Sequence, residues 1–164
     1  MAVDMFLKLD GIKGESADHK HKDEIHIESF SWGLSQTGAH GTGGGGGAGK
    51  VAVHDISITK FVDKSTASLM LACCSGKHIP NGLITVRKAG DKPLEYLKIK
   101  LTDILISGVQ DAGHGSDLLS ENVSLNFAKF HVEYQEQKPD GSGTPGGEMG
   151  WDVKKQTFNI NNSI

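Results

Sequence analysis

Hydrophobic and polar side chains alternate with a period of two along most of the chain. In the first segment four apolar side chains share one face: Val3, Met5, Leu7 and Leu9. Asp4 and Lys8 lie on the other face, together with the apolar Phe6. Because successive side chains of a strand point to opposite sides of a sheet, this pattern predicts half-buried β-strands.

The alternation changes phase by one residue near the middle of four long segments. These segments span residues 25–36, 51–61, 97–106 and 123–134. In the first of them the apolar positions pass from odd numbers (Ile25, Ile27) to even numbers (Phe30, Trp32, Leu34). A one-residue shift turns every later side chain to the other face, so each change predicts a bulge or a sharp bend.

Bent strands that serve two sheets are typical of a small closed or nearly closed barrel, and of a sandwich with orthogonal packing. The alternative is that these strands are buried on both faces, in which case the phase carries no information. A chain of 164 residues is long enough for one such core. We therefore expect a single mainly-β domain over residues 1–164, a small β-barrel of two sheets with bent strands and one flanking helix.

The flanking helix is predicted within residues 63–76. Residues 63–66 offer candidate N-caps, and Gly76 is a natural C-terminal stop. Three small or apolar residues recur at helical spacing and should face the barrel wall: Leu69, Ala72 and Cys73. Cys73 and Cys74 are adjacent, and neighbouring residues rarely form a disulfide, so we expect both to act as small packing groups.

Glycine is unusually frequent, and its placement is uneven. The chain has 22 glycines, and eight of them lie within residues 38–49, between two expected strands. Such a segment has almost no side chains to offset the entropy lost on ordering, and fully extended it could reach roughly 40 Å. Two interpretations stay open: a flexible tether, and an arm that becomes ordered on contact with another copy.

Residues 44–50 also match the phosphate-binding pattern G-x-x-x-x-G-K. That motif needs a Ser or Thr next, where this chain has Val51, and it needs a helix where the alternation predicts a strand. We therefore reject nucleotide binding and expect no cofactor.

Charge and the ends of the chain narrow the function classes. The formal net charge is −3, which lacks the basic excess of nucleic-acid binders. No apolar run approaches the roughly 18–20 residues of a membrane span, and the beginning lacks signal-peptide features. We expect a cytoplasmic protein, or one exported by a route that reads the folded molecule. Towards the end we expect a Gly/Pro loop over 139–150, a last strand over 151–158 and a frayed tail over 159–164.

Eight histidines raise the question of a metal or catalytic site. His19 and His21 lie in a charged loop, residues 11–24, but have no third ligand of fixed geometry nearby, so we expect solvated side chains. His54, beside Asp55, and His114 have no serine in a G-x-S-x-G turn to act with. His131 is expected at an ordinary exposed strand position.

Basic residues do not change this expectation. Arg87, Lys88, Lys98 and Lys100 form a modest basic patch, most simply a solvated sheet face. The sequence therefore predicts no metal site and no enzyme.

Several short stretches together carry a family resemblance. They are residues 1–9 (MAVDMFLKL), 13–16 (KGES), 31–36 (SWGLSQ), 43–50 (GGGGGAGK), 60–66 (KFVDKST) and 121–128 (ENVSLNFA), followed by Tyr134. In this order, over essentially the whole chain, they resemble the Hcp family, the haemolysin-coregulated proteins of type VI secretion.

The resemblance implies a β-barrel subunit that assembles into a six-membered ring with a wide hole. Such rings stack into the inner tube of a contractile injection apparatus, are ejected with its spike, and carry or chaperone small effector proteins in the hole. The implied partners are further copies of the chain (a homo-hexamer), type VI effectors, and sheath and spike proteins. No nucleic acid or membrane insertion is implied, and secretion through the apparatus needs no signal peptide.

The resemblance also points to site residues, because the second strand borders the hole in this family. On that strand four small residues lie opposite Phe30 and Trp32 and are expected to line the hole: Ser29, Ser31, Gly33 and Ser35. Ser31 is the first choice, and the alternative is an ordinary serine on the outer wall. The glycine-rich segment is expected to contact neighbouring subunits through Gly38, Gly41, Gly43, Gly44, Gly45, Gly46, Gly47, Gly49 and Lys50.

Ring stacking is expected to be weaker than ring closure. We expect charged residues of the 11–24 and 111–120 loops to supply salt-sensitive stacking contacts. Two other classes of function stay open: a small-barrel hydrolase whose site escapes motif inspection, and a stand-alone secreted effector or adhesin that acts by itself.

Overall fold

The computed structural model describes residues 2–38, 49–115 and 117–159. Within them, one helix accompanies the strands, α1 (Thr66–Ser75). The strands are β1 (Val3–Leu9), β2 (Ile25–Ile27), β3 (Ser29–Ser31), β4 (Leu34–Ser35), β5 (Ala52–Val53), β6 (Ile56–Phe61), β7 (Ile79–Lys88), β8 (Leu94–Ala112), β9 (Ser120–Gln137), β10 (Gly143–Asp152) and β11 (Thr157–Phe158). The described part of the chain contains no helix with the length and apolar character that a membrane crossing requires.

Nine of the described strands form one antiparallel sheet, and seven of them follow one another in the order β11-β10-β9-β8-β7-β1-β2. In addition, β6 pairs with β9, and β3 pairs with β6. Since only Glu28 separates β2 from β3, the sheet curls round until its two ends meet at that residue. The barrel is therefore interrupted at Glu28 rather than continuously hydrogen-bonded. The prediction of a mainly-β fold with bent strands, two sheets and one flanking helix is confirmed, with β4 and β5 as the second sheet.

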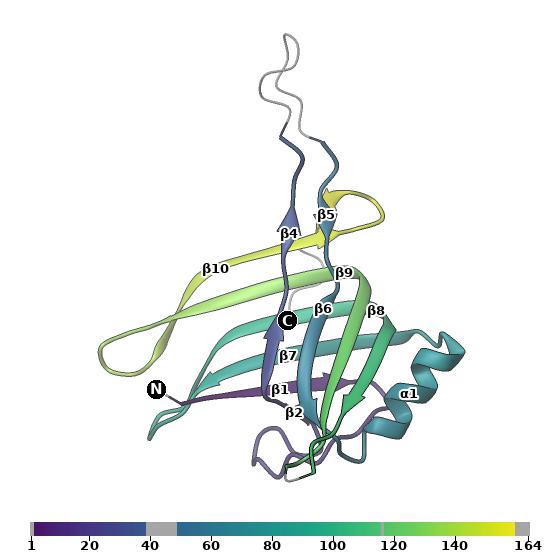
Figure 1. Ribbon diagram of the computed structural model, residues 1–164. Helices are drawn as coiled ribbons and strands as arrows, with labels where there is room; N and C mark the ends of the chain where they lie inside the picture. Colours follow the sequence, from purple (N-terminus) through teal and green to yellow (C-terminus); the bar gives the residue numbers. More distant parts are fainter. Residues whose placement is uncertain (1, 39–48, 116, 160–164) are drawn as a thin grey trace.

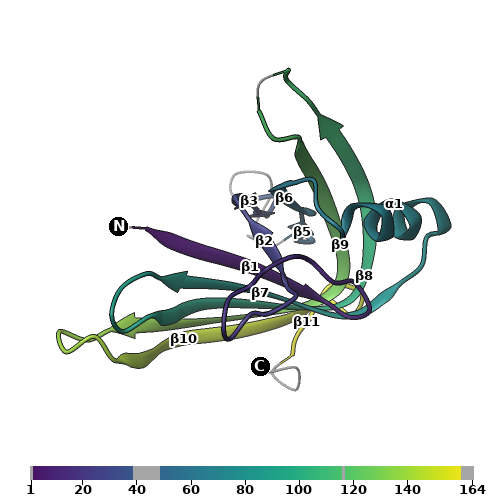
Figure 2. The same ribbon diagram turned by 90° about the horizontal axis from the view of Figure 1, so that it is seen from below.

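The two longest strands bend at the same level (Figure 2). The β8–β9 register runs through Thr102–Lys129, omits Asp103 and Ala128, and resumes at Ile104–Phe127. Asp103 has a φ of 55°, in the left-handed region where Asp is among the few tolerated residues. The bend divides the sheet into two parts. The flat half comprises β1, β7, β10 and residues 94–102 and 129–137, and the upright half comprises β3, β6 and residues 104–112 and 120–127.

All four predicted phase changes coincide with a break in a strand or with a shift in its pairing. The one in residues 25–36 lies at Glu28, and the one in residues 51–61 lies between β5 and β6. The other two are the bend itself. The alternative of strands buried on both faces is wrong, because Ser31 and Asn122 are exposed while Ile58 and Val123 are buried.

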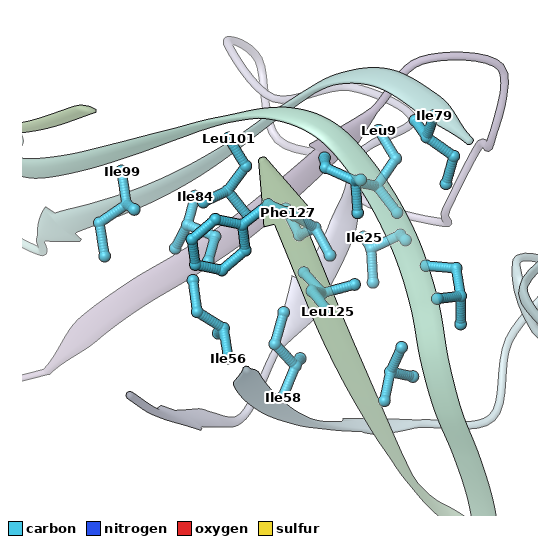
Figure 3. Packing of buried hydrophobic residues seen from close by; sticks show 14 of the residues in the cluster. Leu9, Ile25, Ile56, Ile58, Ile79, Ile84, Ile99, Leu101, Leu125 and Phe127 are labelled. Carbon is cyan, nitrogen blue, oxygen red and sulfur yellow. The ribbon is translucent and has the colours of Figure 1, made fainter. Parts of the chain in front are cut away.

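The core fills the angle between the two halves (Figure 3). Ile84 and Leu101 come from the flat half, and Ile56, Ile58 and Leu125 from the upright half, all with almost no exposed surface. Burial of each such side chain stabilises the fold by about 1.5–3 kcal/mol. The phase change at the bend is what allows β8 and β9 to present apolar residues to the same core on both sides of it.

Helix α1 packs against β8 through its buried Leu69 and Ala72 and its half-buried Cys73, as predicted. The Asp63 carboxylate accepts hydrogen bonds from the Ser65 main-chain and hydroxyl groups just before the helix. Gly76 ends it with a φ of 66°. Glycine suits this left-handed position because it has no Cβ to clash.

The expected loop over 139–150 is wrong for most of its length, because β10 pairs with β9 from Gly143 onwards. The long free edge of β9 supplies hydrogen-bond partners for this strand, which the sequence of residues 139–150 does not reveal by itself. A Cβ at Gly146 would come within 2.6 Å of the Tyr134 ring, so the glycine permits close pairing. The expected last strand, 151–158, is split by a turn into the end of β10 and β11. Of the expected tail, residues 160–164 lie outside the described residues.

Candidate functional site

The outer face of the upright half carries small uncharged side chains in cross-strand rows. One row joins Ser29, Thr59, Asn122 and Gln110, and the next joins Ser31, Ser57, Ser124 and Gly108. We call these eight residues the serine face. Their strand neighbours Ile58 and Val123 point into the core, so the alternation turns the whole set outward.

The rows fit together closely although no large side chain fills them. The Thr59 hydroxyl donates a hydrogen bond of 2.8 Å to the side-chain oxygen of Asn122. A Cβ added at Gly108 would lie 3.5 Å from the Ser124 hydroxyl oxygen, an ordinary contact. None of the eight residues is charged or large and apolar. The serine face can therefore exchange hydrogen bonds but offers little to grip a partner through ion pairs or apolar burial.

Trp32, which follows β3, fixes the direction in which this strand faces. Its ring meets Phe127 and Phe130 edge-on, with ring centroids 5.9 and 4.9 Å away. Its indole N–H donates a 2.9 Å hydrogen bond to the main-chain oxygen of His54. Buried aromatic anchoring on one side of the strand leaves Ser31 with no route into the core.

The structure brings only part of the sequence-based set together. Ser29 and Ser31 belong to the serine face, whereas Gly33 lies in the link between β3 and β4. Ser35 is on the separate two-stranded sheet, and its hydroxyl oxygen lies 3.1 Å from Nε2 of His54. Sequence reasoning missed the members on β6, β8 and β9. Their signal was present, since Asn122 and Ser124 alternate with Val123 and Leu125 in the same way.

The glycine-rich segment begins and ends on β4 and β5, which extend away from the barrel (Figure 1). Leu34 pairs with Val53 and Ser35 with Ala52. Gly38, Gly49 and Lys50 are exposed at the base of the segment. A Cβ at Gly49 would collide with the Thr37 side chain, so the two chains approach closely there. The other expected interface residues, Gly41, Gly43, Gly44, Gly45, Gly46 and Gly47, lie outside the described residues.

A cavity of about 430 Å³ near β5 contains the histidines and carboxylates to be considered for catalysis. Its lining includes His54, Asp55, His78 and Asp103. Asp55 accepts hydrogen bonds from Ser107, at 2.6 Å, and Asn126, at 2.8 Å. His54, which lies beside Ser35, is therefore not oriented by this neighbouring carboxylate, as a Ser-His-Asp arrangement requires.

His21 is not the solvated residue that the sequence predicted. Its side chain is buried, and its Nδ1 and Nε2 atoms contact Glu24 and Glu95, the latter at 2.8 Å. The ring stacks on Phe6 with a centroid distance of 4.3 Å. Phe6, the apolar residue on the polar side of β1, thus holds the 11–24 loop in place. In the described ranges no three His, Cys, Asp or Glu side chains gather as a metal site would need.

The predicted basic patch is wrong for Arg87, which is buried and paired. Its guanidinium donates to both carboxylate oxygens of Asp18, at 3.0 and 2.6 Å, and to Asp4 at 3.1 Å. The hydrogen bond from Arg87 holds the pKa of Asp18 well below its usual range. Burial raises the pKa of Glu95, but the hydrogen bond to His21 and the nearby Lys98 outweigh burial and lower it. Ion pairs and hydrogen bonds between charged side chains of the same copy therefore cover the outer face of the flat half.

His131 is also buried, not exposed as predicted. It lies on β9 between Lys100 of β8 and Gly150 of β10. The imidazole lies beside Gly150, which has no side chain and is hydrogen-bonded to Asn159, and its Nε2 atom is 3.3 Å from the Glu148 carboxylate. Alternation along one strand does not reveal which other segments of the chain pack over its outward-facing residues.

Comparison with known proteins agrees with this architecture. Residues 6–134 match the family model described as "Type VI secretion system effector, Hcp". The protein hcp1 of Pseudomonas aeruginosa is 52% identical over 158 residues, which cover 94% of this chain and 98% of that protein. The crystal structure of Hcp1 from Salmonella typhimurium is 36% identical and superposes with a TM-score of 0.80, over 97% of this chain and all of that one.

Two further solved structures have the same fold. A structure described as a type six secretion system protein has a TM-score of 0.89 and 28% identity, covering 96% of this chain and 100% of that one. A type VI secretion system effector from Yersinia pestis has a TM-score of 0.74 and 34% identity, covering 92% and 100%. With a family model matching most of its length and a relative of more than half identity, the chain belongs to the Hcp family of type VI secretion system effectors.

Proposed function

We propose that six copies of this chain form a ring whose hole is lined by the serine face, and that stacked rings carry small effector proteins in that hole. The single observation that supports this assignment is the serine face, which extends over four strands without a charge. A folded cargo must enter, be held and leave. Small neutral groups suit this task, because large apolar or charged patches would bind cargo too firmly or too selectively.

Ring closure needs two different surfaces on each copy that meet head to tail. The glycine-rich segment and Lys50 are one candidate surface, since β4 and β5, the described strands on either side of this segment, extend away from the barrel. We propose that contact with neighbouring copies orders this segment. The chain would then gain its assembled form in the cytoplasm and leave through the type VI apparatus together with sheath-driven spike proteins.

We propose no enzymatic step. The pairing of Asp55 with Ser107 and Asn126 removes the carboxylate that would orient His54. His78, in the same cavity as His54, does pair with Asp103, at 2.6 Å, but no serine, threonine or cysteine is among the described residues that line this cavity, so the hydrolase alternative has no nucleophile there.

The experiment compares wild-type rings with two variants. Ser31→Gln places a longer side chain in the proposed lining, and Lys100→Gln places the same residue on the outer face of the flat half as a control. Native mass spectrometry should find six copies for both variants. Effector proteins that co-purify with wild-type rings should be retained several-fold less by Ser31→Gln and normally by Lys100→Gln.

Two results would contradict the proposal. A wild-type protein that stays monomeric at micromolar concentration contradicts ring formation. Intact Ser31→Gln rings with undiminished cargo contradict the lining assignment, and would place Ser31 on the outer wall.

A further inference from the structure

The end of β6 and the start of β9 lie at the end of the upright half that is remote from β4 and β5 (Figure 1), and exposed apolar residues gather in the sequence there. We call this cluster the apolar knob. It consists of Phe61, Val62, Leu118 and Leu119, whose exposed fractions are 41, 36, 71 and 50%. The main-chain N–H of Val62 donates a 2.9 Å hydrogen bond to the oxygen of Leu119, so the two segments are tied together. Neighbouring exposed apolar side chains on a soluble protein usually mark a contact surface.

Two of the charged residues that were expected to supply stacking contacts are paired within their own copy, whereas Lys13, Glu15, Lys20 and Lys22 of the 11–24 loop are exposed. Asp18 is paired with Arg87, and Glu24 contacts His21, within the same copy. In the loop between β8 and β9, the large exposed apolar side chains are Leu118 and Leu119. The 111–120 loop, which was expected to meet the next ring through charges, therefore also presents apolar surface beside its exposed Asp111 and Asp117.

The opposite end of the molecule carries a matching depression. A groove of about 550 Å³ lies between the β4–β5 hairpin and β10. We call it the hairpin groove. Its apolar walls are Leu34, Val51, Met149 and Trp151, and Leu34 is 48% exposed. The volume is within the range of sites that accept several apolar groups.

Charge at the two ends is complementary. Asp117, exposed, precedes Leu118 in the knob, and Lys50 is part of the groove lining. Two different patches at opposite ends of one chain are what a repeating head-to-tail contact requires. Two identical knobs facing each other would bring their Asp117 side chains together instead.

We propose that the apolar knob of one copy docks in the hairpin groove of a copy in the next ring, with Asp117 facing Lys50. The occupant of the groove is thus a second copy of this chain. The assignment rests on the proposed ring assembly. It replaces the purely ionic stacking contact by an apolar contact with one ion pair, Asp117–Lys50, at its edge. Stacking should then survive moderate salt, which screens only the ion pair.

Disulfide trapping between separately labelled copies tests the contact. The native thiols are first removed by Cys73→Ala and Cys74→Ser. Rings of Leu118→Cys are mixed with rings of Leu34→Cys and oxidised. A matched control replaces Leu118→Cys by Leu71→Cys, which is similarly exposed, at 68%, but lies on α1. The proposal predicts cross-linked double rings from the first mixture and not from the control.

Three results would contradict the docking. The first is that neither mixture gives double rings, and the second is that disulfides form only within single rings. The third is that Leu34→Cys is trapped by Gly44→Cys but not by Leu118→Cys, which would make the glycine-rich segment the occupant of the groove. Single rings of normal mass in these cases leave the proposed function intact, whereas absence of rings in the untreated samples would count against the proposed function itself.

A substitution gives an independent measure. Leu118→Asp should raise the concentration at which stacked rings sediment by about tenfold or more, as loss of a buried leucine contact implies. Leu71→Asp, the matched control, should leave that concentration unchanged. Equal sedimentation of the two variants as stacked rings would contradict the assignment.

Discussion

The two halves of the bent sheet have opposite outer faces although they share β8 and β9. On the flat half, Arg87, Asp18, Glu95 and His21 link the 11–24 loop to the sheet. On the upright half, the serine face bears no charge, and the charged pair of that half, Lys60 and Glu121, points to the inside. The outer face of the flat half is therefore covered by charged groups that pair with one another, whereas the outer face of the upright half carries small neutral groups, as the proposed cargo-lining role requires.

The inward pair of the upright half should give the largest effect. Lys60 Nζ lies 2.9 Å from the Glu121 carboxylate and 3.1 Å from Asp63, with both Lys60 and Glu121 almost fully buried. Burial raises the pKa of Glu121 although Lys60 opposes this. Lys60→Met leaves that carboxylate without its cation and should lower the free energy of unfolding by about 3–5 kcal/mol. Urea unfolding at fixed protein concentration measures it.

The matched control for this prediction is the double variant Lys60→Met, Glu121→Leu. It removes both charges and should regain most of the lost stability, since replacing a buried pair by apolar groups is often neutral. If the double variant were no more stable than Lys60→Met, the pair would not account for the loss.

On the flat half, Asp18→Asn should lower the free energy of unfolding by about 1.5–3 kcal/mol at pH 7, through loss of charged hydrogen bonds to Arg87. Because the folded pKa of Asp18 is depressed, its stabilisation is complete above the unfolded pKa of about 3.9 and is lost as pH falls below it towards the folded value. The difference between wild type and variant should therefore shrink below about pH 4. Asp91→Asn, in an exposed turn, is the control. A difference that stays constant with pH would argue against the pairing.

Trp32→Phe tests the anchor that turns the serine face outward. It keeps an aromatic ring but removes the N–H that donates to the His54 oxygen, so unfolding should become easier by about 0.5–1.5 kcal/mol. Thermal unfolding followed by far-UV circular dichroism measures the change. Unchanged stability would mean that the hydrogen bond contributes nothing to the position of β3.

Substitutions in the serine face should have little effect on the free energy of unfolding. Ser57→Ala and Ser57→Lys should each change the free energy of unfolding by no more than about 0.5 kcal/mol. In assembled rings, however, Ser57→Lys would place like charges around the hole. Cargo retention by that variant should become salt-dependent, while retention by Ser57→Ala should not. Salt-independent retention by both variants would contradict this.

The bends were predictable because they leave a mark in each strand separately. Residues 25–36 and 123–134 reveal their breaks through a change from odd to even apolar positions. The serine face was predictable by the same logic, but only the strand containing Ser31 was interpreted for its polar side. The flanking helix was signalled by the spacing of Leu69 and Ala72.

Features that depend on covering segments could not be predicted in this way. His21 is buried because Glu24 and Phe6 surround it, and the buried His131 lies beside Gly150, which is hydrogen-bonded to Asn159. Strand β10 forms because β9 offers a free edge, not because its glycines favour extended structure. Each of these outcomes requires contacts between parts of the chain that are distant in sequence.

Intermolecular distances test the central claim most directly. A spin label at Ser31→Cys is compared with one at Leu71→Cys, both in chains that also carry Cys73→Ala and Cys74→Ser. In a six-fold ring with the serine face towards the hole, pulsed electron paramagnetic resonance should find three distances at Ser31 in a ratio of roughly 1: 1.7: 2, all shorter than their counterparts at Leu71. Distances at Ser31 longer than those at Leu71, or no intermolecular distances at either position, would contradict the account.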